Sequence, residues 1–207
     1  NLVGYNSKQP FCSADGKYLF FSSDRPGGFG QFDIWYALIR EGGTIAEPVN
    51  AGPLLNSAVN EQAPFYHNSS NTLVFSSDRM PGMGGFDLFS AAGKETQWSI
   101  PENVGHPINS SRDDLYFFAA EKSSLINKAI ISSDRGSDCC LETYTVTKMA
   151  KNKMFAGEIR DCKDKEPVAD AEVVMKDASG KTWRTTTGAD GKYAFELTGA
   201  IDHRLLT

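Results

Sequence analysis

The amino-acid sequence predicts an all-β protein, namely a partial β-propeller with three visible blades followed by a truncated β-sandwich. The main observation is a repeat, because the tetrapeptide Ser-Ser-Asp-Arg begins at Ser22, Ser76 and Ser132, with spacings of 54 and then 56 residues. A period of about 40 to 55 residues with several strands per unit is typical of propellers, whose units bury their apolar faces against neighbouring units. A second observation is that the apolar residues follow strand patterns rather than a helical period, so we expect little helix.

The first repeat unit consists of short predicted strands separated by turn residues. Residues 10–13 form a short strand, and residues 18–22 form a nearly continuous apolar strand of the kind that is buried on both faces. Residues 26–30 are a glycine-rich loop that needs positive φ angles. Residues 33–38, which are mostly β-favouring, resume as a third strand, and a fourth element begins near Ile45.

The segment that joins one unit to the next also recurs. Six residues of the first unit return in the second: Pro48, Asn50, Gly52, Leu55, Asn56 and Ser57 correspond to Pro101, Asn103, Gly105, Ile108, Asn109 and Ser110. The third unit has strand patterns at residues 115–120, 129–132 and 141–146, but none for a fourth strand before Met154. Since propellers usually have about 4 to 8 blades and protect their sheet edges, we expect further blades upstream of residue 1 and a missing strand supplied from there.

The sequence pattern changes after the basic residues 148–153, so we expect one domain over residues 1–150 and a second over residues 151–207. Alternating strands in residues 155–161, 167–175 and 185–195 are joined by turn residues at 177–180 and 189–192. This pattern predicts a β-sandwich. A seven-stranded sandwich needs about 100 residues, so we expect the second domain to be incomplete at its C-terminus.

Both domains resemble known modules. The motif Asp-Gly-x-x-Leu-x-Phe-Ser-Ser-Asp-Arg, followed by a glycine-rich loop and Phe-Asp-Ile-Trp, is similar to the TolB-type (WD-like) β-propeller repeat over residues 9–148. The loop sequence Pro-Gly-Gly-Phe-Gly resembles the corresponding loop in propellers of OmpA-family envelope proteins. The third unit lacks this loop. Residues 155–195 resemble the carboxypeptidase regulatory-like domain, which has an Ig/transthyretin-like fold.

The order of the two modules is similar to that of periplasmic envelope lipoproteins of the OmpA family. This resemblance implies a non-enzymatic scaffold of an outer-membrane-associated, peptidoglycan-tethered complex, with type IX secretion as the implied system. The implied partners are other envelope or secretion-system proteins, and peptidoglycan would be bound only through a C-terminal domain that this chain lacks.

Two other functions are open on the sequence alone. The first is a propeller that binds carbohydrate or peptide, for which the aromatic residues Tyr18, Phe20, Trp35, Phe75, Phe89 and Trp98 are candidate contacts, although aromatic residues in strands more often form core. The second is the non-catalytic half of a peptidase. The nucleophile motif G-x-S-x-G of such enzymes does not occur in this sequence.

Charge and composition argue against other classes. Nucleic-acid binders usually carry a basic patch or stripe, and the net charge of -5 argues against such a surface. We therefore expect no nucleic-acid partner. No run of about 18 apolar residues is present, so we expect no transmembrane segment. The histidines His67, His106 and His203 lie far apart, which argues against a zinc hydrolase. None of the candidate calcium ligands lies in a D-x-D-x-D-G loop, and these are Asp15, Asp33, Asp87 and Asp190. We therefore predict no catalytic residue, metal or cofactor.

The polar residues of the repeats are predicted to be structural, because polar groups at strand ends usually hydrogen-bond neighbouring turns. This set comprises Ser22, Asp24, Arg25, Asp33, Ser76, Asp78, Arg79, Asp87, Ser132, Asp134 and Arg135. No ligand-binding residue can be assigned from the sequence.

The four cysteines lack the paired C-x-x-C spacing of a zinc site. In an oxidising compartment Cys139 or Cys140 could bond to Cys162, and in the cytosol all four would be free thiols. The sequence leaves both possibilities open.

Overall fold

The computed structural model describes residues 2–119, 121–148, 153–177 and 179–197. The described residues form antiparallel strands and one short 3₁₀ turn, η1 (Glu41–Gly43), with no α-helix among them. The prediction of an all-β fold is confirmed. The chain divides into two compact units, Asn1–Lys148 and Met149–Thr207, which are described separately below.

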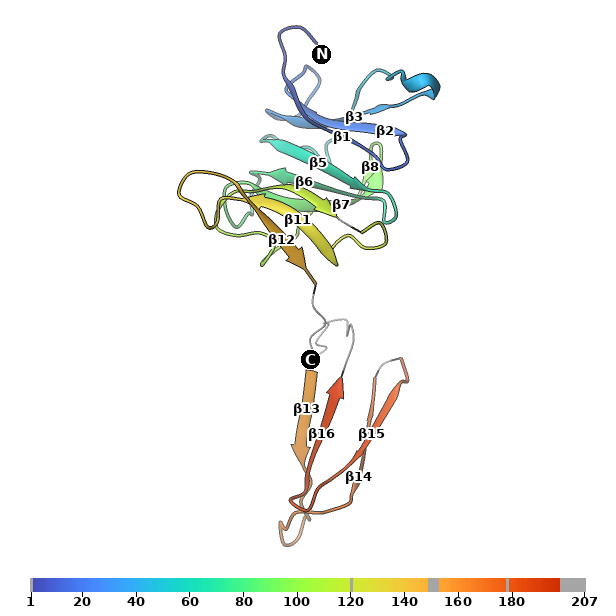
Figure 1. Ribbon diagram of the computed structural model, residues 1–207, viewed down its shortest axis with the longest axis vertical. Helices are drawn as coiled ribbons and strands as arrows, with labels where there is room; N and C mark the ends of the chain where they lie inside the picture. Colours follow the sequence, from blue (N-terminus) through green and yellow to red (C-terminus); the bar gives the residue numbers. More distant parts are fainter. Residues whose placement is uncertain (1, 120, 149–152, 178, 198–207) are drawn as a thin grey trace. The chain divides into compact units, whose positions relative to one another are not determined.

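The first unit contains three successive sheets, which we call blades 1, 2 and 3 (Figure 1). Blade 1 has the order β1 (Ser7–Cys12), β2 (Tyr18–Ser23), β3 (Asp33–Leu38) and β4 (Val49–Asn50). Blade 2 has the order β5 (Glu61–His67), β6 (Thr72–Ser77), β7 (Asp87–Lys94) and β8 (Gln97–Trp98), with β9 (Glu102–Asn103) also paired to β7. Blade 3 has three described strands, β10 (Asp114–Ala119), β11 (Lys128–Ser133) and β12 (Glu142–Thr147).

The blades pack face to face. Successive side chains of a strand point to opposite faces of its sheet, so one strand can contact the blades on both sides. In β6, Leu73 and Phe75 join a buried cluster with Phe20 of blade 1. Val74, between them, joins a second cluster with Ile131 of blade 3. Strand β6 is therefore covered on both sides, and the three sheets are consecutive blades of a partial β-propeller.

Backbone hydrogen bonds fix the ends of neighbouring blades relative to one another. The N–H of Glu61, at the start of β5, donates to the carbonyl of Phe32 over 2.6 Å, and the N–H of Asp114 makes the same bond to Phe86. The loop between the second and third strands of one blade thus lies beside the start of the next blade. These loops and the connectors between blades form one face, which we call the loop face.

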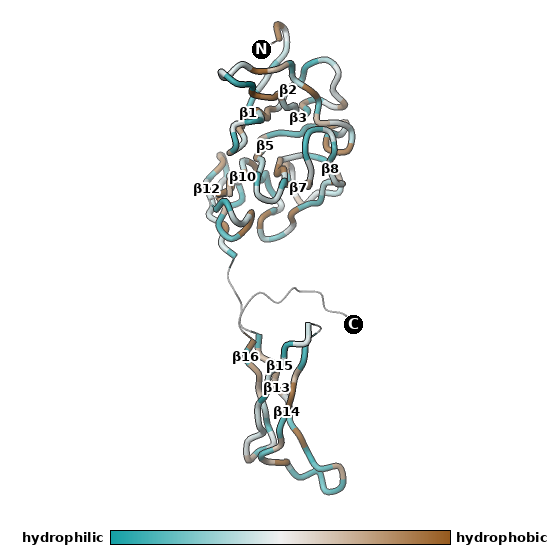
Figure 2. The backbone as a smooth tube through the Cα atoms, turned by 90° about the vertical axis from the view of Figure 1, so that its right-hand side faces the viewer, coloured by the Kyte–Doolittle hydropathy of each residue, from teal (hydrophilic) through white to brown (hydrophobic). Residues whose placement is uncertain are grey.

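The second unit contains two small antiparallel sheets, as expected of a partial β-sandwich. Strand β13 (Lys153–Glu158) pairs with β16 (Lys192–Leu197), and β14 (Glu172–Lys176) pairs with β15 (Thr182–Thr186). Figure 2 shows how hydrophobic and hydrophilic residues alternate along these strands. Phe195 and Leu197 of β16 are buried and provide the core of this unit.

Candidate interaction surfaces

The arginine of each Ser-Ser-Asp-Arg motif lies at the end of the second strand of its blade. The backbone N–H and the Nε of Arg79 both donate to Ser77 Oγ. Its Nη2 donates to Glu61 Oε1 over 2.8 Å and to the carbonyl of Leu55, which belongs to the connector from blade 1. The side chain of Glu61 is 0% exposed and that of Arg79 is 16% exposed. Arg79 therefore joins its own blade to the connector of the preceding blade.

Blade 3 repeats this arrangement with different residue types. Arg135 forms an ion pair with the buried Asp114 and donates to the carbonyls of Pro107 and Ile108 in the connector from blade 2. The connector serine adds bonds to the acid in both cases, since Ser57 donates to Glu61 and Ser110 donates to Asp114. Sequence reasoning missed the two acids. Their equivalent positions at the start of the first strand could have been found by aligning the units on the connector serines Ser57 and Ser110, because each acid follows its serine by four residues.

The aspartates of the motif accept hydrogen bonds from the residue that immediately precedes the first strand of their own blade. Asp24 accepts from the backbone and side-chain amides of Asn6, and Asp78 accepts in the same way from Asn60. These bonds lower the pKa of Asp24 below its ordinary value, with the side-chain bond from Asn6 as the largest cause. Asp134 accepts from the N–H of Asp113.

Asp33 and Asp87 organise the glycine-rich loops at the start of the third strand. Asp33 accepts from the backbone N–H groups of Phe29 and Gly30 and from Asn50 Nδ2. A Cβ added at Gly28 would lie 2.5 Å from Asp33 Oδ2, so this loop can close on the carboxylate only with glycine there. Asp87 binds the equivalent loop of blade 2.

The first serines of the motif lie within the second strand of their blades, and the buried Oγ atoms of Ser22 and Ser76 have no hydrogen-bond partner among the described residues. Ser22 and Ser76 are fully buried, and Ser132 pairs with Leu115 and Thr143 of the neighbouring strands. The structure thus places the polar residues of the repeats within and between blades.

Two buried asparagines of the connectors, which the sequence showed only as recurring residues, make the same pair of hydrogen bonds in blades 1 and 2. Asn56 accepts from the N–H of Ile34 and donates to the carbonyl of the same residue. Asn109 makes the same pair of bonds to Leu88 in blade 2. Each side-chain amide makes hydrogen bonds of the kind that a neighbouring strand would make. These bonds fix the connector to the third strand of its blade.

In the structure Cys139 and Cys140 form a disulfide with each other, while Cys12 and Cys162 are free and exposed. A bridge from Cys139 or Cys140 to Cys162 is therefore absent from it. The disulfide lies in the loop between β11 and β12, which belongs to the loop face.

The loop face carries large apolar side chains that are exposed to solvent. They come from three inter-strand loops and one connector and comprise Phe29, Leu54, Met80, Met83 and Leu141, of which Met80 is 82% exposed. Exposed apolar residues that gather on one face are typical of protein-interaction sites, and methionine adapts its shape to different partners.

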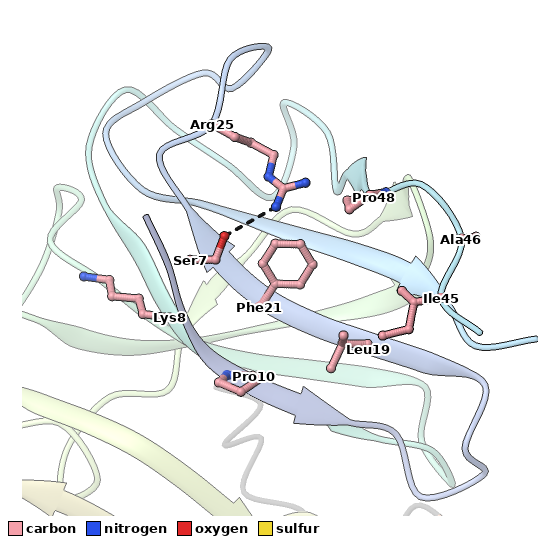
Figure 3. Close-up of a pocket in the computed structure, with 9 residues that line it drawn as sticks. All are labelled: Ser7, Lys8, Pro10, Leu19, Phe21, Arg25, Ile45, Ala46 and Pro48. Carbon is pink, nitrogen blue, oxygen red and sulfur yellow. Dashed lines mark hydrogen bonds between the residues drawn. The ribbon is translucent and has the colours of Figure 1, made fainter. Parts of the chain in front are cut away.

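A second candidate surface is a pocket of roughly 510 Å³ on the face of blade 1 that points away from blade 2 (Figure 3). Leu19, Phe21, Ile45 and Pro48 supply its apolar lining. Arg25 reaches over it, with its guanidinium 4.8 Å from the Phe21 ring centre and 5.3 Å from that of Trp35. Burial lowers the pKa of Arg25, and the charge of Glu47 opposes this shift.

The aromatic residues considered for sugar stacking are mostly core. Phe20, Trp35, Phe75, Phe89 and Trp98 are buried, and Tyr18 is partly buried against the first cluster. Within the ranges that the structure describes, no group of three or more His, Cys, Asp or Glu side chains is arranged to hold a metal ion. The same residues contain no helix with the length and apolar character needed to cross a membrane.

No family model and no curated protein matches the chain. Among solved structures, the chain is similar to a protein from Agrobacterium tumefaciens that is assigned as a TolB, with 14% sequence identity and a TM-score of 0.45. The match covers 95% of this chain and 60% of the other, so the chain spans about three fifths of the length of that protein.

Proposed function

We propose that this chain is a non-enzymatic protein-interaction module of a periplasmic scaffold, and that the loop face binds its partners. The observation that carries the proposal is the set of exposed apolar side chains on this face, of which Met80 and Met83 come from blade 2, between blades 1 and 3. The order of the modules resembles that of PorE, a component of the type IX secretion machinery. We therefore propose other proteins of an outer-membrane-associated, peptidoglycan-tethered complex as partners.

The distribution of polar groups supports an interaction role over a catalytic one. Asp33 is buried and bonded to its own glycine-rich loop, and the ion pairs of Arg79 and Arg135 are directed into the contacts between blades. Rigid blades that present variable loops on one face are a common platform for protein binding. The burial of Phe75 and Trp98 argues against the alternative of sugar stacking.

The test compares two double variants by site-specific photo-crosslinking in the envelope of the native organism. Met80→Ser with Met83→Ser alters the loop face, and Ile126→Ser with Val174→Ser removes exposed apolar side chains elsewhere. We expect crosslinks from a probe at position 29 to envelope proteins, at least fivefold fewer in the first variant and unchanged in the second. Equal crosslinking in both variants, or an entirely cytoplasmic location of the protein, would contradict the proposal.

A further inference from the structure

The two contacts between blades share one arrangement around the motif arginine. In the first, Leu55 of the connector is 0% exposed and lies in the cluster that contains Phe75 and Phe89. In the second, Ile108 is 7% exposed and lies in the cluster that contains Ile131. In both, the carbonyl of the inserted aliphatic residue accepts from the arginine of the following blade. Each connector thus places an aliphatic side chain between two blades.

Blade 1 has the same receiving groups on the face that carries the pocket. Phe21, Trp35 and Arg25 correspond in the repeat to Phe75, Phe89 and Arg79. The guanidinium of Arg79 lies over Phe75 and Phe89 at 5.2 and 5.3 Å, and that of Arg25 lies over Phe21 and Trp35 at similar distances. The pocket in Figure 3 is therefore the counterpart of the site that Leu55 fills in the next blade.

Arg25 lacks the connector carbonyl that Arg79 and Arg135 bind, and a second polar group on this face of blade 1 has no partner among the described residues. In the described part of the chain, the side-chain bonds of Arg25 go to the hydroxyl groups of Ser7 and Ser23 and to no connector carbonyl. The Nε1 of Trp35 is buried and has no hydrogen-bond partner among these residues. Both observations indicate a site built for a further main-chain segment.

We propose that this pocket binds the connector of a further repeat unit that precedes blade 1, with a branched aliphatic side chain against Phe21 and its carbonyl bonded to Arg25. The proposal goes beyond the loop face and does not depend on it. A second copy of this chain cannot supply the segment without unfolding, because Leu55 and Ile108 are already buried. The occupant is therefore a connector from a repeat outside the 207 residues.

The charge around Arg25 further defines the incoming segment. Ser7 occupies the position of Glu61 and Asp114, so the neutral hydroxyl of Ser7 replaces the carboxylate that pairs with Arg79 or Arg135. No carboxylate of the described chain lies within ion-pair distance of Arg25. We expect the incoming connector to supply one, at the position where the other connectors carry Ser57 and Ser110, because that position faces the acid in both known contacts.

Two synthetic peptides test this inference on the complete 207-residue chain. One has the sequence of residues 52–58, and the other carries Asp in place of Ser57. We expect both peptides to shift the indole N–H signal of Trp35 in NMR spectra, assigned with Trp98→Phe and Trp183→Phe variants, and the acidic peptide to bind at least fivefold more tightly. A peptide with Leu55→Asp should not bind, and Arg25→Met should abolish the preference for the acidic peptide.

A longer chain provides a second measurement that does not depend on weak peptide binding. Residues 1–60 are joined to residues 7–207, so that an added repeat places its own connector before Ser7. We expect a higher Tm than for the 207-residue chain, and loss of the gain when Leu55→Asp is introduced in the added copy alone. No shift with either peptide together with no gain in Tm would overturn the proposal. Self-association of the original chain that Phe21→Asp abolishes would also overturn it, because a second copy would then occupy the pocket.

Discussion

Arg79 donates to the buried carboxylate of Glu61 over 2.8 Å and at the same time to the carbonyl of Leu55 in the preceding connector. One side chain thereby holds the end of β6, the start of β5 and the segment that arrives from blade 1. Breaking a buried ion pair by removing one partner typically costs about 3–5 kcal/mol, because the other charge stays buried.

We therefore predict that Arg79→Met lowers the free energy of unfolding by about 3 kcal/mol, measured by urea denaturation. Arg25→Met is the matched control, because Arg25 has the same repeat position but bonds only to serine hydroxyl groups. We expect it to cost about 1–2 kcal/mol, because it loses two hydrogen bonds to neutral hydroxyl groups but leaves no buried charge unpaired. Equal losses in the two variants would show that the ion pair does not join the blades.

The bonds between Asn56 and Ile34 give a second prediction. Asn56→Ala leaves the buried N–H of Ile34 without a partner, whereas the carbonyl of Ile34 keeps its bond from the N–H of Ala51. One unsatisfied buried group costs about 1–3 kcal/mol, so we expect a loss of this size in unfolding free energy, with a similar loss for Asn109→Ala. The exposed Asn127→Ala serves as the control and should change stability by less than about 0.5 kcal/mol.

Stability should fall at alkaline pH because of two tyrosines in the first core cluster. Burial raises the pKa of Tyr18 to about 12, with a further contribution from its hydrogen bond to Glu95, and burial also raises the pKa of Tyr66 to about 12. The unfolded phenols ionise near pH 10, so the unfolded state loses its protons first as the pH rises. The contribution of these tyrosines is thus complete below pH 10 and is lost between about pH 10 and 12.

Denaturation experiments from pH 8 to 12 measure this loss, and tyrosinate absorbance at 295 nm follows the ionisation. Tyr18→Phe should remove part of the decline in unfolding free energy between pH 10 and 12. The variant should differ less from the unaltered chain at pH 12 than at pH 8. A Tyr18→Phe variant whose stability declines as steeply as that of the unaltered chain would contradict the assignment to this residue.

Much of the fold was predictable because the repeat period and the turn residues are explicit in the sequence. The first strand was expected at residues 10–13 but begins at Ser7, because a bulge lies between Lys8 and Phe11. Gln9 has φ of 54° in this bulge, and Ala63 and Tyr116 have positive φ at the equivalent positions of β5 and β10. Since none of the three is glycine, the sequence carries no local signal for the bulge.

The contacts between blades were harder to predict because their residue types vary. Glu61, Asp114 and Ser7 occupy one structural position but share no side-chain chemistry across all three units. The motif arginines were recognised, whereas their partners in the connectors depend on how the sheets stack. The apolar loop face was also missed, since Phe29, Met80 and Leu141 are isolated residues in the sequence and gather only when the blades align.

Amide hydrogen exchange of the 207-residue chain tests the central claim, that three consecutive blades stack with open faces at both ends. We expect the slowest exchange in β6 (Thr72–Ser77), which is covered on both faces, and faster exchange in β2 (Tyr18–Ser23) and β11 (Lys128–Ser133), each covered on one face. Adding a duplicate repeat before blade 1, by joining residues 1–60 to residues 7–207, should then slow exchange in β2 and leave exchange in β11 unchanged. Exchange in β6 as fast as in β2 and β11 would contradict the stacked arrangement.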